Sequence, residues 1–346
     1  DLNVGDDHFF FSLISAADDS LHHFLPVFAG QSPLRSGAGN ILPAGTSFFC
    51  SYTFSDKESF FKRLDSYFTH SDFYYKREEQ MTYFGRSTRT KIREVFNGIV
   101  KDEVLVAATT IPVDPANKTV FFLLHTSDRD EAEQQLNKLL QNYAKRQEIS
   151  LDSLKMTYSV GEEADYPVYR FPLHSLPGVW LGSPFGVAEA RFVTFFEGYM
   201  VFANSERGIR EYLRGMTLGQ PLGEDTGYRR FSRNTSSRAN IHVYADINRS
   251  FALVKELFSG KMTEKIEEKG ETLRKFSALG WQVRQEDEFY FNSLVVGFNP
   301  HASGQAQTTW QSTLGSNIIL KPLLVNNHHD FSKNEIIVQD ENHLLH

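Results

Sequence analysis

The sequence predicts an α+β fold with mostly antiparallel sheets, helices packed on one face, and two related lobes built from strand–helix units. First, a segment with the pattern of a strand, a cap residue and an amphipathic helix occurs four times in 346 residues. Second, short alternating segments without long helices lie between two of these units, which is typical of antiparallel hairpins. Irregular spacing excludes a solenoid with a period of ~20–50 residues. Two explanations for the four units remain open. One is an internal duplication of the chain, and the other is that any α+β domain contains such units.

Residues 1–42 are predicted to combine short helices with loops. Within His8–Phe28, apolar side chains are spaced to line one side of one or two short helices. Gln31–Pro43 is rich in Ser, Gly and Pro, which predicts a loop. The chain begins at Asp1 without a Met or a basic segment, so we expect that a leader or membrane anchor has been removed.

The first predicted lobe, residues 43–165, contains two of the strand–helix units, Thr46–Leu64 and Thr119–Leu140. Each begins with a strand-like run and continues with apolar residues at the three- and four-residue spacing that one helix face buries. Asp or Ser between strand and helix accepts hydrogen bonds from the free N–H groups of the first helical turn. The predicted caps are Ser55 or Asp56 and Ser127 or Asp128.

The segment from Asp72 to Thr110 is predicted to form several short strands, FYYK, MTYFG, KIREVFNG and EVLVAATT. In such a strand Arg89, Lys91 and Arg93 share one face, where they suit an anion or a glycan phosphate. The alternative interpretation is that these three residues lie on a solvent-exposed sheet face and bind no ligand. The nearby aromatic residues either pack in the core or stack on a sugar or a partner; they are Tyr74, Tyr75, Tyr83 and Phe84.

The second predicted lobe, residues 166–308, holds the other two units, Tyr199–Leu213 and Ala239–Leu257. Glu197-Gly198 is the signal of a two-residue hairpin turn. A long charged helix is predicted over Met262–Phe276. The predicted caps of the two units are Asn204 or Ser205 and Asp246 or Asn248. The last strand pair is predicted over Trp281–Arg284 and Glu288–Phe298.

Trp180 lies in a stretch, 172–184, that is rich in Pro and Gly and is predicted to be irregular. In such a loop an indole is placed to contact a ligand or partner. Glu162, Glu163 and Asp165 have the chemistry of an acid/base pair, although three acids at a hairpin tip usually form a solvated turn.

Composition and motifs argue against several classes of function. The net charge of −7 argues against a dedicated nucleic-acid binder, which carries a basic footprint. The single cysteine, Cys50, sits in a strand and is predicted to be a small buried hydrophobe. Adjacent histidines diverge on strands and helices, so neither His22-His23 nor His328-His329 predicts a metal site. Nucleotide-binding, hydrolase and zinc-protease motifs are absent from the sequence, and no cofactor is predicted.

The region from Trp180 to Val254 resembles the bacterial family of unknown function numbered 3352. The resemblance rests on WLG at Trp180–Gly182, on YMVFANSERGIREYL, PLGEDTGYRRF and HVYADIN, and extends over about 42–300. Tyr228 stands where the family pattern has Phe. The resemblance implies an extracytoplasmic domain behind an N-terminal membrane segment. Residues 309–346 are similar to the opening of a β-propeller that follows such domains in Bacteroidetes proteins, which predicts a tail leading to a further domain.

With the location that the resemblance implies, these observations predict a module of the bacterial cell envelope that binds or scaffolds another envelope protein or a glycan without catalysis. Trp180, Arg89, Lys91 and Arg93 are its predicted contact residues. The alternative is an envelope hydrolase that acts on glycan at a site between the lobes. Carboxylates gathered in a deep pocket would favour the hydrolase, and a broad aromatic or apolar surface patch would favour the scaffold.

Overall fold

The computed structural model divides the chain into two compact units, Asp1–Gln305 and Ala306–His346. The residues it describes are 2–5, 7–16, 23–111, 114–160, 164–250, 275–298, 322–326, 334–343 and 345. Within the described part of the second unit, β13 (Leu323–Asn326) pairs with β14 (Asn334–Ile337) as an antiparallel hairpin. The boundary between the units lies close to the predicted start of the tail at residue 309.

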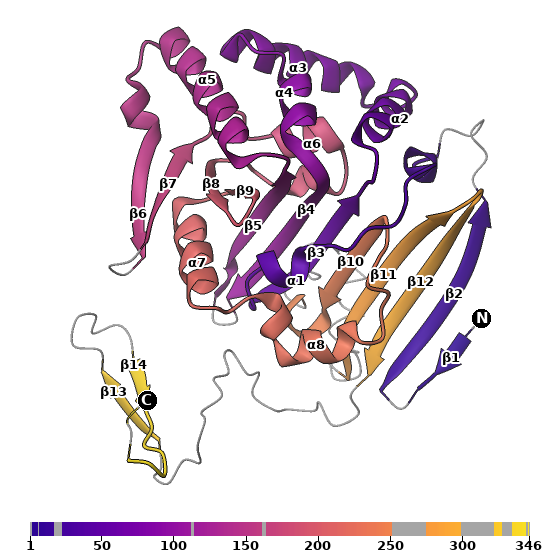
Figure 1. The fold of residues 1–346 in the computed structure, drawn as a ribbon, viewed down its shortest axis with the longest axis vertical. Helices are drawn as coiled ribbons and strands as arrows, with labels where there is room; N and C mark the ends of the chain where they lie inside the picture. The colour runs from indigo at the N-terminus through magenta and orange to yellow at the C-terminus, as the bar shows by residue number, and fades with distance from the viewer. Residues whose placement is uncertain are drawn as a thin grey trace. The chain divides into compact units, whose positions relative to one another are not determined.

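One sheet runs through the described part of the first unit, in the order β1-β2-β12-β11-β10-β3-β4-β5-β9-β8-β7-β6 (Figure 1). Every neighbouring pair in this sheet is antiparallel. The α+β class and its antiparallel sheet are therefore confirmed. The strands are β1 (Leu2–Val4), β2 (His8–Ala16), β3 (Thr46–Thr53), β4 (Val100–Ile111), β5 (Asp114–Thr126), β6 (Lys155–Val160), β7 (Ala164–Arg170), β8 (Phe192–Phe196), β9 (Tyr199–Ala203), β10 (Ile241–Asp246), β11 (Phe276–Glu286) and β12 (Phe289–Phe298).

Helices cover both faces of this sheet, not one face as predicted. In β5, Phe122 and Leu124 pack in one core, whereas Phe121 and Leu123 pack in the other. A strand that is buried on both faces has a continuous run of apolar residues, and β5 contains such a run, VFFLL. The first core lies under α2 (Lys57–Thr69), α3 (Tyr74–Thr88), α4 (Ile92–Ile99), α5 (Arg129–Gln147) and α6 (Leu176–Leu181). The second lies under α1 (Ala38–Ile41), α7 (Glu206–Thr217) and α8 (Thr226–Ser232).

Three of the four strand–helix units form as predicted because their signals are local. In α2 the Asp56 carboxylate accepts from the Ser59 N–H, 3.1 Å away. Asp128 caps α5 and Ser205 caps α7 in the same way. In the fourth unit Asp246 accepts from the Arg249 N–H at 2.9 Å. The apolar helix stripe predicted to follow Asp246 lies outside the described residues. Most of the helix predicted over 262–276 also lies outside them. Glu197 and Gly198 form the predicted turn, with φ of 43° and 80°.

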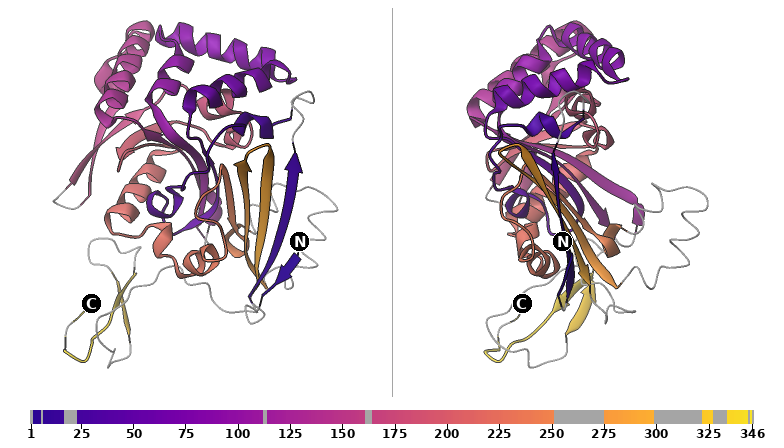
Figure 2. Two further views of the ribbon diagram at one scale, coloured as in Figure 1. Left: turned by 45° about the vertical axis from the view of Figure 1, so that its right-hand side comes forward. Right: turned by 90° about the vertical axis from the view of Figure 1, so that its right-hand side faces the viewer.

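Several of the predicted elements are wrong. The strands predicted between Asp72 and residue 99 are the helices α3 and α4; only EVLVAATT forms a strand, within β4. The helices predicted within His8–Phe28 are replaced over His8–Ala16 by β2, and in the part of this segment that the structure describes, 8–16 and 23–28, the helical piece is the 3-10 turn Leu25–Phe28. Figure 2 shows β2 beside β12 near the N-terminus, and this pairing gives β2 backbone partners that the local sequence does not reveal.

The two predicted lobes, 43–165 and 166–308, are parts of one sheet. β10, from the second, pairs with β3, from the first. β9 likewise pairs with β5, and the β6–β7 hairpin crosses the predicted boundary. Shared backbone hydrogen bonds therefore join the two lobes. Among the described residues, the search for a helix long and apolar enough to cross a membrane found none.

Candidate functional site

An apolar groove of about 790 Å³ lies on the first face of the sheet, between α3 and the segment that follows α6. Its walls come from the end of α2, the start of α3, and residues 175–187. Phe68, Val179 and Leu181 supply apolar wall, and Lys76 and Gln80 supply polar wall along α3. We define this groove, together with the exposed aromatic residues of α3, as the α3 surface.

Arg77 fixes the two sides of the groove to each other. Its side chain is only 6 % exposed in relative area, and its Nε donates to the Val179 carbonyl at 2.9 Å. Nη2 reaches the Trp180 carbonyl at 3.2 Å and the Asp65 carboxylate at 2.9 Å. Burial lowers the pKa of Arg77, the nearby charge of Arg93 lowers it further, and Asp65 opposes both. The result is a rigid wall held by charge-assisted hydrogen bonds.

Two glycines in the wall formed by residues 175–187 allow close packing that a side chain would prevent. Gly182 has φ of +77°, and a Cβ there would lie 2.7 Å from the Phe68 ring. A Cβ on Gly178 would lie 2.7 Å from the Gly186 Cα. A side chain at Gly182 would therefore collide with Phe68 and strain the backbone, and a side chain at Gly178 would collide with the backbone of Gly186.

Large apolar side chains stand exposed around the groove. Phe73 is 71 % exposed and Val187 is 60 % exposed, and both line the groove. Along α3, Tyr75 and Tyr83 are also exposed, whereas Phe84 is buried. Clustered exposed apolar side chains mark interaction surfaces in soluble proteins.

A second pocket, of about 540 Å³, lies at the other end of α3 and brings the three predicted basic residues together. The strand alternation predicted for them is wrong, because Arg89 ends α3 with φ of 49°, Lys91 is the N-cap of α4, and Arg93 lies within α4. Arg86 joins them from the last turn of α3. We call this set, Arg86, Arg89, Lys91 and Arg93, the basic pocket.

The charges of the basic pocket are only partly neutralised. Lys91 pairs with Glu94 at 2.8 Å, and Arg93 pairs with Glu78 at 2.5 Å. Within the described part of the chain, Arg86 and Arg89 form no ion pair. Both are exposed, so they are available to an acidic group of a partner.

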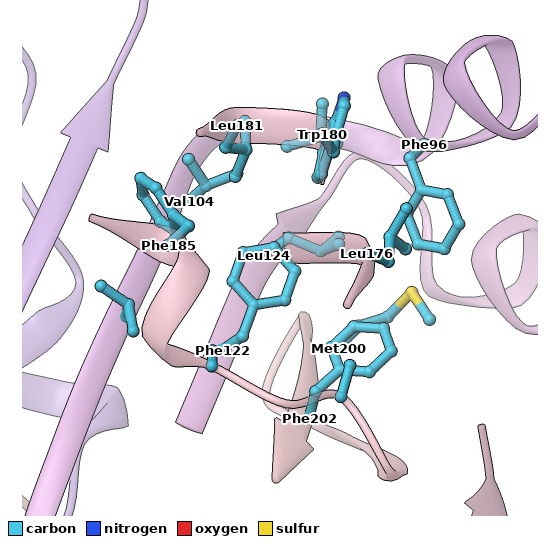
Figure 3. Close-up of a cluster of buried hydrophobic side chains, with 14 of the residues drawn as sticks. Phe96, Val104, Phe122, Leu124, Leu176, Trp180, Leu181, Phe185, Met200 and Phe202 are labelled. Carbon is cyan, nitrogen blue, oxygen red and sulfur yellow. The ribbon is translucent and has the colours of Figure 1, made fainter. Parts of the chain in front are cut away.

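The predicted exposure of Trp180 is wrong. Its side chain is 1 % exposed, lies 5.4 Å from the Phe61 ring in a stacked arrangement, and donates from Nε1 to Asn97 at 2.8 Å. Figure 3 shows Trp180 projecting from α6 into the cluster that contains Phe96 and Leu181. A short helix replaces the predicted irregular stretch at this point, since Leu176–Leu181 has a row of side chains to bury. Trp180 therefore belongs to the core and does not line the groove.

The acidic hairpin tip considered for an acid/base pair is described only in part. Asp165 accepts from Ser159 at 2.5 Å in an exposed hairpin, and Glu162 and Glu163 lie outside the described residues. Among the residues that the structure describes, no group of three or more His, Cys, Asp or Glu has metal-binding geometry. Cys50 is buried as predicted, and burial raises the pKa of its thiol to about 12.

Sequence reasoning missed Phe73, Lys76 and Val187 and named Tyr75 and Tyr83 only as part of a mixed aromatic set. The signal that would have found Tyr75, Lys76 and Tyr83 is the helical stripe of α3. Its buried positions follow a spacing of four, three and four residues, and these three residues fall off that stripe. The stripe does not mark Phe73, which precedes Arg77 by four residues, or Val187, which lies outside α3. The buried residues of the stripe are Arg77, Met81, Phe84 and Thr88.

Comparison with known proteins returned no matching family model, no matching characterised protein and no matching solved structure. The resemblance to family 3352 therefore stays a prediction, and the site must be interpreted from its own geometry.

Proposed function

We propose that this chain is a non-enzymatic binding module whose α3 surface holds an apolar segment of a partner protein. The observation that carries the proposal is the groove of about 790 Å³ with Phe73 and Val187 exposed at its edge. Binding sites of this size are concave and mostly apolar, with a few polar groups that fix orientation. If the chain works in the bacterial cell envelope, as the resemblance to family 3352 implies, the partner is another envelope protein.

Charge complementarity defines the partner segment more closely. Its apolar anchor occupies the groove, where Lys76 lies exposed along one wall. Its acidic residues meet Arg86 and Arg89 in the basic pocket. Phe73 and Arg89 are separated by about 24 Å along the helix axis, at 1.5 Å per residue. The favoured segment therefore carries an apolar or aromatic anchor and acidic residues roughly 20–25 Å away.

The test is a selection of random linear peptides displayed on phage against the whole chain. We expect the recovered peptides to combine an aromatic or aliphatic anchor with acidic residues. A synthetic copy of the best peptide should bind Phe73→Ala roughly tenfold more weakly than the unaltered chain, because exposed aromatic anchors dominate such interfaces.

Phe289→Ala is the matched control, since Phe289 is also an exposed phenylalanine, on β12 and outside the groove. Its peptide affinity should match that of the unaltered chain within about twofold. Equal affinities for Phe73→Ala, Phe289→Ala and the unaltered chain would contradict the proposal, as would a selection that enriches no peptide.

A further inference from the structure

Apolar side chains form two rows across five neighbouring strands on the first face of the sheet, the face that α2 to α6 cover elsewhere. Strand pairing places the members of each row directly opposite one another on β10, β11, β12, β2 and β1 (Figure 1). The two rows are two residues apart on every strand, so both point to the same side. We call them the apolar ladder; the rows are Val243, Trp281, Leu294, Phe11 and Leu2, and Ala245, Leu279, Val296, Phe9 and Val4.

The apolar ladder is partly open in the described part of the chain. Leu2 and Val4 are each 61 % exposed, and the other members are half-buried. Val243 and Trp281 pack against the first core, whereas the remaining members belong to neither core of the described residues. Leu13 extends the ladder along β2 on the same face and is 67 % exposed.

The opposite face of the same strands is covered, yet it is the more polar of the two. Phe231 of α8 packs there against Tyr244 of β10. The polar side chains of His242, Gln282 and Ser293 lie opposite one another on this face. An antiparallel sheet with one solvated face carries its polar side chains on that solvated face. These strands show the reverse arrangement, which indicates that a partner covers the apolar ladder.

The composition and size of the apolar ladder favour a second copy of this chain as its cover. The ladder contains no charged side chain, so it cannot select a partner by charge, whereas an identical apolar face matches it. Five strands ~4.8 Å apart and three residue rows ~6.8 Å apart, counting Leu13, span roughly 500 Å². Two copies would bury roughly 1,000 Å², which is where specific but weak interfaces begin.

We infer that two copies of this chain associate face to face through their apolar ladders. The two sheets then pack as those of a β-sandwich do, about 10 Å apart with side chains of both filling the space. Each copy contributes the same surface, which a twofold axis requires. The apolar ladder shares no residue with the α3 groove, and the association is independent of the function proposed for that groove.

Sedimentation velocity of the whole chain between about 1 and 200 µM tests the inference. We expect a reversible monomer–dimer equilibrium with a Kd of roughly 10 µM, because the buried area lies near the lower limit for specific interfaces. Leu13→Glu should raise this Kd at least roughly tenfold, since it places a charge in an apolar interface. Val4→Glu, on β1, should have the same effect.

Ile14→Glu is the matched control. Ile14 is the next residue of β2, is 64 % exposed, and points to the opposite face of the sheet. Its Kd should stay within about twofold of that of the unaltered chain, because the new charge remains in water. A chain that stays monomeric at the highest concentration would overturn the inference, as would equal effects of Leu13→Glu and Ile14→Glu.

Thermal unfolding at about 1 µM, where the chain is mostly monomeric, separates association from folding. Leu13→Glu and Ile14→Glu should both unfold at the temperature of the unaltered chain. A lower unfolding temperature confined to Leu13→Glu would place a segment of the same chain on the apolar ladder and would also overturn the inference.

Discussion

The two faces of the central sheet bury different chemistry. Under α2 to α6 the core is aromatic, and Phe54, Phe60, Phe61 and Trp180 follow one another in ring contact. On the opposite face, beneath α1, a carboxylate is buried: Glu103 is 2 % exposed. Aromatic rings therefore dominate the interior of one face, and the other face encloses a carboxylate.

Hydroxyl and backbone N–H groups donate hydrogen bonds to both carboxylate oxygens of Glu103. Its Oε1 accepts from the hydroxyls of Ser36 and Ser51, each at 2.6 Å. Its Oε2 accepts from the Gly37 N–H at 2.9 Å and from the Tyr199 hydroxyl at 2.7 Å. Four donors therefore satisfy both oxygens of this buried carboxylate.

The two faces therefore differ in what stabilises them and in what they hold in place. The aromatic core gives α3 and α6 a rigid base, and the groove is built on that base. The Glu103 network fixes residues 36 and 37 to the sheet. Stability of the first face therefore depends on packing, whereas that of the second depends on complete hydrogen bonding.

The largest expected effect is on the aromatic face. Trp180→Ala should lower the free energy of unfolding by about 3–5 kcal/mol, since a fully buried indole leaves a cavity and an unpaired Asn97. Chemical denaturation followed by circular dichroism measures it. Tyr75→Ala, at a position that is 84 % exposed, should stay within about 0.5 kcal/mol of the unaltered chain. Similar losses in both variants would contradict the burial of Trp180.

A smaller loss is expected on the polar face. Glu103→Gln should cost about 2 kcal/mol of unfolding free energy, because four charge-assisted hydrogen bonds become neutral and the amide adds donors where donors already point. Glu94→Gln is the control, as it removes only an exposed pair with Lys91 and should change stability by under about 0.5 kcal/mol. A loss for Glu103→Gln no greater than that of its control would show that the network contributes nothing.

The smallest effect is a pH dependence on the same face. Burial holds the pKa of His242 below its ordinary value of 6.5, so the unfolded chain takes up this proton before the folded chain does. The stability that His242 contributes is therefore complete above pH 6.5 and is lost as the pH falls below it, by at most about 1.4 kcal/mol per pH unit.

Denaturation of the unaltered chain and of His242→Gln between pH 5 and 7.5 measures this contribution. The unaltered chain should lose more stability toward low pH than His242→Gln. His174→Gln serves as the comparison, because burial also lowers the pKa of His174, far from the polar network. Identical slopes for the unaltered chain and His242→Gln would contradict a neutral, buried His242.

The errors of sequence interpretation have physical causes. α3 was predicted as strands because Arg77 occupies a buried position of its helical stripe, and an arginine there breaks the apolar pattern. That arginine is buried only because Asp65 and two distant carbonyls satisfy it. β2 was predicted as helix because its backbone partner, β12, lies far away in the sequence.

What the sequence alone determined is the set of strand–cap–helix units, because their signals act within a few residues. Asp56, Asp128 and Ser205 each accept from an N–H three residues ahead. Which strands are neighbours, which aromatic residues are exposed, and what surrounds Glu103 were decided only by the tertiary structure. The Tyr199 hydroxyl that reaches Glu103 is 96 positions away, and such a contact exists only after the sheet has brought β4 and β9 into place.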